Sequence, residues 1–229
     1  VWVDDRGGSV RKLTPNLYRA IIDEAHKNNI RVMAHEYYLA DTRDLVEAGV
    51  DGFLHSVRDA EMDDALIARM KARNVFLAPN LGINGRTFRS QPPWYDDPLL
   101  AEVYSTAVIQ RVRTAAQNRN PNAPGPGGGP TSYAKQIASL AKANKAGVTI
   151  VLGDDSGIQD NFSGYVELQQ LVSMSEAGMT PQQVLVAATR AAAELLRLND
   201  MGSIAAGKSA SFVVLDANPL EDLANARKI

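Results

Sequence analysis

The chain has 229 residues, which is enough for one large domain with its own hydrophobic core. Its net charge of −2 gives no reason to expect nucleic acid or a membrane surface as a partner, and no apolar run approaches the ~18 residues of a membrane span. Because there is no cysteine, disulfides and thiolate metal sites are excluded, while cytoplasmic and exported locations both stay open.

Residues 1–80 alternate between apolar runs and amphipathic segments. The apolar runs predict strands over 1–5, 30–35, 50–55 and 75–80. Apolar side chains at helical spacing predict helices between them, over 15–28, 41–48 and 60–73. Units of roughly 20 to 30 residues in β-α order predict parallel strands joined by right-handed crossovers.

An insertion then interrupts the repeat over residues 81–131. It holds a loop, a predicted helix near 97–118 and a segment rich in Pro and Gly at 120–130. An insertion of this length after a strand is typical of a lid or a substrate-binding loop. A tolerated surface excursion is the alternative interpretation.

The repeat resumes after the insertion. The sequence predicts helices over 133–146, 164–177 and 181–198, and a strand that ends at Asp155. A further apolar run at 210–215 predicts a strand outside the repeat, which needs a sheet to join. The fold class is therefore α/β, and strands that are apolar throughout indicate a parallel sheet covered on both faces, as in a β/α barrel.

Three potential metal ligands end three of the predicted strands: His35, His55 and Asp155. Imidazole nitrogen and carboxylate oxygen are ligands for zinc, manganese and iron. One histidine alone would more simply be a core residue, but the repeated position favours a divalent metal site. Since a barrel brings the carboxyl ends of its strands to one face, we predict that the three side chains converge there.

Several residues lie next to these candidate ligands or at the end of another predicted strand. Adjacent strand residues point to opposite sides, so only one of Asp154 and Asp155 can face the site, and Glu36 should point away from His35. Tyr37 is a candidate substrate contact, with a covering role at the barrel rim as an equal alternative. Asn80 ends its strand and is a second candidate substrate contact.

The remaining histidine, His26, is interpreted as a surface or helix-cap residue on an outer helix.

Four segments resemble one family. They are VMAHE at 32–36, GVDGFLHS at 49–56, TIVLGDDSG at 149–157 and the closing segment at 177–223. The chain resembles the carboxyl-terminal part of an amidohydrolase-superfamily enzyme, in the branch with imidazolonepropionases and metal-dependent prolidases. The resemblance implies a partial TIM-type (β/α) barrel of metal-dependent-hydrolase type over 1–200, from about strand four to strand eight. Residues 201–229 would be the return segment of a small composite β-domain.

The same resemblance implies a function. It is hydrolysis of a carbon–nitrogen bond in an amide, a dipeptide or a cyclic amide by a metal-activated water, with one or two divalent ions in the intact enzyme, zinc first among them. His35, His55 and Asp155 would hold metal. Asp155 would also accept a proton from the water and pass it to the leaving amine.

The chain lacks some of the residues that the family uses as metal ligands. No His-x-His pair occurs in the chain, and the family's fourth-strand lysine would fall before Val1. A half barrel leaves apolar strand edges open. We therefore expect a longer natural protein or an obligate assembly, either a homo-oligomer or a chain completed by a missing amino-terminal half, and weak metal binding at most by the isolated chain.

Two alternative functions stay open. One is a catalytically incomplete fragment without activity of its own. The other is a deaminase of the same superfamily, although such enzymes carry a glutamate a few residues after the fifth-strand histidine and here Glu36 directly follows His35.

Overall fold

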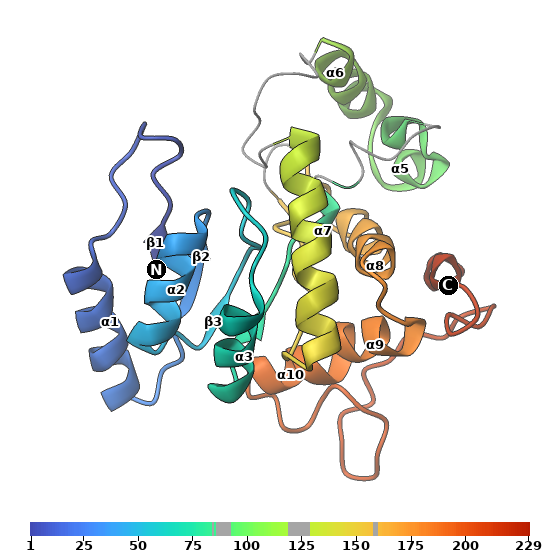
Figure 1. Ribbon diagram of the computed structural model, residues 1–229. Coiled ribbons are helices and arrows are strands. Elements are labelled where there is room, and N and C mark those ends of the chain that lie inside the picture. The colour runs from blue at the N-terminus through green and yellow to red at the C-terminus, as the bar shows by residue number, and fades with distance from the viewer. Residues whose placement is uncertain (84, 86–92, 119–128, 158–159) are drawn as a thin grey trace.

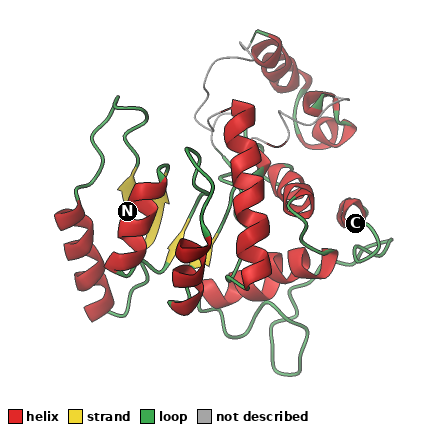
Figure 2. Cartoon of the chain, in the orientation of Figure 1, coloured by secondary structure: helices red, strands yellow, loops and turns green. Residues whose placement is uncertain are grey.

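The sheet is parallel and its strands lie in chain order. The computed structural model describes residues 1–83, 85, 93–118, 129–157 and 160–229. The four strands, ordered β1-β2-β3-β4, are β1 (Trp2–Val3), β2 (Met33–Glu36), β3 (Gly52–Phe53) and β4 (Phe76–Leu77). All neighbouring pairs are parallel, which confirms the prediction of a mixed α/β protein (Figure 1, Figure 2).

The predicted strand before Asp155 lies beside β4 but, among the residues that the structure describes, forms only one bridge, between Leu77 and Ile150. The Leu77 amide donates to the Thr149 carbonyl, and the Val151 amide donates to the Leu77 carbonyl, each at 3.0 Å. The next amide, of Leu152, donates to a helix instead of a strand. The segment therefore adds a fifth position to the sheet order without a full ladder.

Helices connect and cover these strands. The first three follow β1, β2 and β3 in turn: α1 (Pro15–Lys27), α2 (Leu39–Ala48) and α3 (Asp64–Ala72). The later elements are the 3₁₀ helix η1 (Trp94–Asp96), α5 (Pro98–Val103), α6 (Thr106–Gln117), α7 (Gly129–Ala146), α8 (Val166–Glu176), α9 (Pro181–Val186), the π-helix η2 (Ala187–Ala191), α10 (Ala192–Leu195) and the 3₁₀ helix η3 (Leu223–Arg227). No helix within the described ranges is long and apolar enough to cross a membrane.

Capping side chains explain several helix boundaries. The helix predicted from 60 begins at 64, because the Asp63 side chain accepts the Leu66 amide at 2.9 Å and so fixes the first turn. The reciprocal capping box predicted at Thr180 and Gln183 forms and starts α9. Gly49 ends α2 with a φ of 91°, in the left-handed region that glycine adopts without strain.

The helix predicted near 97–118 is two helices, α5 and α6. Tyr104 between them has an extended backbone, and the Ser105 side chain accepts the Val108 amide to begin α6. Figure 1 shows α5 and α6 standing apart from α7 and from the helices that pack along the sheet. Of the predicted Pro- and Gly-rich segment, residues 120–128 lie outside the described residues.

The strand predicted at 210–215 is wrong. These residues have no strand structure, and Phe212, Val213 and Val214 are 65%, 64% and 73% exposed. An apolar, β-branched run forms a strand only where a neighbouring edge offers hydrogen bonds and packing. The chain returns to the core after this run, where Leu223 of η3 is buried in the main cluster.

The main core joins the sheet to its helices. Its largest fully buried side chains include Tyr18 of α1, Phe53 of β3, Met70 of α3, Leu77 of β4 and Leu140 of α7. This core fixes the carboxyl ends of the strands, where the predicted ligands stand.

A second, smaller core joins the insertion to the segment before α8. It consists of Trp94, Leu100, Val112, Phe162 and Tyr165. The first three belong to η1, α5 and α6, and the last two to the segment before α8. The insertion is thus packed onto the chain that follows the predicted Asp155 strand.

Candidate functional site

His35 and His55 are in contact at the carboxyl ends of β2 and β3. Their ring centroids are 4.3 Å apart, with the planes nearly perpendicular. On its other side the His35 ring stacks on Trp2, with centroids 3.7 Å apart and planes 7° from parallel. The register explains this, because Trp2 pairs with His35 across β1 and β2.

Asp4 and Asn80 each contact one of these imidazoles. An oxygen of Asp4 lies 3.0 Å from His35 Nε2, and Asp4 is itself buried. The Asn80 amide nitrogen lies 3.4 Å from His55 Nδ1 and also donates to the Leu54 carbonyl. Both partners therefore hold the rings in fixed orientations.

Both histidines are kept in the neutral form at physiological pH. Burial lowers the pKa of His35, and the hydrogen bond to Asp4 only partly opposes this. Burial also lowers the pKa of His55 well below its ordinary value, and the charge of Arg58 lowers it further. Neutral imidazole is the form that binds metal.

Asp155 stands close enough to act on His35 electrostatically but does not complete a ligand set. Its negative charge raises the pKa of His35, while burial raises the pKa of Asp155 itself. Within the described part of the chain, no three His, Asp or Glu side chains lie close enough together to hold a metal ion. The site that these residues form is therefore a histidine pair with nearby carboxylates.

The sequence analysis did not name Arg58 as a site residue, and it expected Glu36 to point away from His35. Arg58 is only 8% exposed, and its charge acts on His35, His55 and Asp155. Glu36 is fully buried, and burial raises the pKa of its carboxyl to about 8. A charged residue three positions after a strand-end histidine was the one available signal for Arg58.

Tyr37 lies beside Arg58. It is half-buried, its carbonyl accepts the Arg58 amide at 3.0 Å, and the Arg58 guanidinium lies 5.7 Å from its ring centroid. His26 is elsewhere, with Nε2 2.8 Å from a carboxylate oxygen of Asp51. The roles of Tyr37 and Asn80 as substrate contacts stay predictions.

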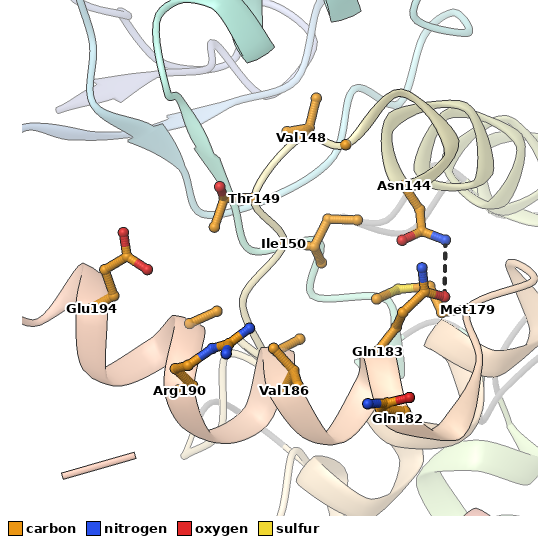
Figure 3. Close-up of a pocket in the computed structure, with 13 residues that line it drawn as sticks. Asn144, Val148, Thr149, Ile150, Met179, Gln182, Gln183, Val186, Arg190 and Glu194 are labelled. Carbon is orange, nitrogen blue, oxygen red and sulfur yellow. Dashed lines mark hydrogen bonds between the residues drawn. The ribbon is translucent and has the colours of Figure 1, made fainter. Parts of the chain in front are cut away.

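A cavity of about 410 Å³ lies at the opposite end of the strand that leads to Asp155 (Figure 3). Its walls are the end of α7, the strand start at 148–150 and the helices α9, η2 and α10. Figure 3 shows Arg190 and Glu194 on its helical wall and the Asn144–Gln183 hydrogen bond on its far side. None of the predicted site residues lines this cavity, so it is separate from the histidine pair.

Comparison with known proteins identifies the family. The sequence model of the Amidohydrolase family matches residues 8–228, so this chain belongs to that family, as the motifs predicted. Imidazolonepropionase of Streptomyces griseus is 35% identical over 72 residues, covering 31% of this chain and 18% of that protein. An uncharacterised protein of Mycobacterium tuberculosis is 27% identical over 188 residues, covering 82% of this chain and 43% of that protein.

A solved structure extends the likeness to the fold. A prolidase complexed with N-methylphosphonate-L-proline superposes with a TM-score of 0.61 at 26% identity, covering 93% of this chain and 45% of that one. The chain therefore spans less than half the length of each of these three proteins.

Proposed function

We propose that this chain contributes the carboxyl-terminal strands of a TIM-type (β/α) barrel and hydrolyses a carbon–nitrogen bond in an amide, a dipeptide or a cyclic amide. One observation carries the proposal. In a member of the Amidohydrolase family, His35 and His55 contact each other at the ends of two adjacent parallel strands. The likeness to an imidazolonepropionase and to a prolidase supports this class of substrate.

The histidine pair fits a divalent ion in type but not in number. Two neutral imidazoles are ligands that zinc accepts, whereas a zinc site normally needs three or four protein ligands. The described residues alone therefore do not make a complete site. We propose His35 and His55 as part of a ligand set for one or two divalent ions, zinc first, with Asp155 as the candidate carboxylate ligand. When bound, such an ion would lower the pKa of a coordinated water to about 7.

The proposed proton carrier is Asp155. Burial raises the pKa of its carboxyl, which brings a carboxylate nearer to the pH at which it can both take up and release a proton. In this role Asp155 takes a proton from the attacking water and delivers it to the leaving amine.

Asn80 and Tyr37 are the proposed substrate contacts. The side-chain oxygen of Asn80, Oδ1, is buried and has no hydrogen-bond partner within the described chain. A substrate N–H could donate a hydrogen bond to it. Tyr37 is half-buried, and its ring centroid lies 5.7 Å from the guanidinium of the buried Arg58.

The test is a substrate screen with matched histidine variants. The purified chain is assayed with zinc or manganese against dipeptides, cyclic amides and simple amides, with product acids and ammonia measured separately. His35→Gln and His55→Gln should each reduce kcat/KM on the order of 100-fold. His26→Gln, the same substitution at the remote histidine, should stay near the wild-type rate.

Other outcomes separate the alternatives. Equal losses in all three variants would contradict the assignment of the pair. Ammonia release from a ring amine, with no amide cleaved, would favour a deaminase. No turnover together with no retained metal would favour a catalytically incomplete chain.

A further inference from the structure

Asp155 has a left-handed backbone, with a φ of 58°. Few residues other than glycine adopt this region, and the backbone costs energy unless its surroundings hold it. The direction of the backbone at this residue decides where its carboxylate points. A contact that holds the Asp155 backbone therefore also aims the carboxylate.

The side chain of Asn161 supplies that contact. Its amide nitrogen donates to the Asp155 carbonyl at 2.9 Å and lies 3.5 Å from the Asp154 carbonyl. In return the Asn161 carbonyl accepts the Gly157 amide at 2.8 Å. Asn161 is only 4% exposed, so water competes little for these bonds.

The neighbouring carboxylate, that of Asp154, accepts a hydrogen bond within its own turn. Asp154 Oδ1 accepts the Ser156 amide at 2.8 Å, as in a turn braced by its own aspartate. Asp154 thus stabilises the turn, and the Asn161 amide holds the backbone of Asp155.

The residue after Asn161 belongs to the second core. The Phe162 ring lies 4.2 Å from that of Tyr104 and 6.3 Å from that of Trp94. Two hydrogen bonds also join the insertion to this segment, from the Tyr104 hydroxyl to the Ser163 carbonyl and from the Tyr165 hydroxyl to the Trp94 carbonyl. The insertion therefore fixes the chain on which Asn161 stands.

We propose that Asn161 is a positioning residue for Asp155, and that the aromatic cluster of Trp94, Tyr104, Phe162 and Tyr165 holds Asn161 in place. The inference rests on the proposed function, in which Asp155 carries the proton. A displacement of about 1 Å at a reacting group can cost about 100-fold in rate. The insertion thus controls the aim of the proposed proton carrier through contacts that lie outside the histidine pair.

Kinetics on a cleaved substrate give the first test. Asn161→Asp keeps the side-chain shape but removes the donor, and Asn161→Ala removes the side chain. Both should lower kcat about 10- to 100-fold and leave KM nearly unchanged, because the contact aims a reacting group and does not bind substrate. Tyr104→Leu should lower kcat in the same direction by less. Asn199→Ala, at an exposed asparagine in the turn after α10, is the control and should keep wild-type kinetics.

Hydrogen exchange gives a second test that needs no turnover. In Asn161→Ala, exchange of the amides at 153–157 should rise while exchange in β2 and α3 stays unchanged. Unchanged exchange at 153–157, or an unchanged kcat in Asn161→Asp, would overturn the positioning role. If the wild-type chain cleaves no amide, the proposed function fails, and the exchange comparison still decides whether Asn161 holds Asp155.

Discussion

Two apolar runs of similar length adopt different structures in this molecule, because one forms a strand and the other does not. The run at 50–55 forms β3, with Val50 and Phe53 at 3% and 1% exposure. The run at 210–215 stays irregular, with Phe212 at 65%. β3 has β2 on one side and β4 on the other, whereas no described strand lies beside 210–215. Strand formation here therefore depends on available neighbouring edges more than on the apolar character of the run.

Truncating one phenylalanine in each run is the sharpest test of this difference. Phe53→Ala should lower the free energy of unfolding by about 3–5 kcal/mol, because it leaves a cavity in the core. Phe212→Ala should change it by less than ~0.5 kcal/mol, because that ring is largely in solvent. Urea denaturation of both variants measures the two values. A loss at Phe212 as large as at Phe53 would show that the tail is packed in solution.

Helix caps give a smaller effect within the helical layer. The Asp63 side chain accepts a backbone amide at the start of α3, whereas the Thr14 side chain makes no such bond at the start of α1. Asp63→Ala should therefore cost about 1 kcal/mol and Thr14→Ala only a fraction of that. Thermal and urea unfolding of the pair provide the measurement, and equal costs would contradict the capping argument.

The smallest expected effect is a pH dependence between α1 and α2. The Tyr18 hydroxyl and the Arg19 guanidinium both donate hydrogen bonds to the Asp44 carboxylate. These bonds, the one from Tyr18 most strongly, lower the pKa of the Asp44 carboxyl. A folded pKa below the unfolded one gives stability that is present above the unfolded pKa of about 3.9 and is lost as pH falls through the folded pKa.

Asp44→Asn should reduce the loss of unfolding free energy that occurs as the pH falls. Unfolding free energies measured from pH 6 down to pH 2 should converge for the variant and the wild type at the acid end. Parallel curves over the whole range would show that Asp44 does not carry this dependence.

Local patterns predicted the order of the fold well. Apolar periodicity placed α1 and the four parallel strands, and the Thr180–Gln183 capping box predicted the start of α9, because these signals act within a few residues. The break between α5 and α6 was missed, since an extended Tyr104 leaves the helical pattern on either side intact.

The site was predicted in outline only. Strand-end positions identified His35 and His55, and their contact follows from the parallel order of β2 and β3. The stacking of Trp2 on His35, the approach of Arg58 and the bond from Asn161 to Asp155 depend on contacts between distant segments. No spacing in the sequence encodes such contacts, because they form only when distant segments pack together.

The π-helical turn η2 sets the rotational phase of the helix that follows it. A π turn contains an extra residue relative to an α turn, so α10 is rotated with respect to α9. Arg31, just before β2, donates to the carbonyls of Glu194 and Leu195 in the orientation that this rotation produces. Deleting one alanine from 187–191 would restore α-helical spacing and turn α10 by about 100°. Both carbonyls would then lose their hydrogen bonds from Arg31. A change of one residue in the length of this helix would therefore alter the contacts at the start of β2, the strand that carries His35.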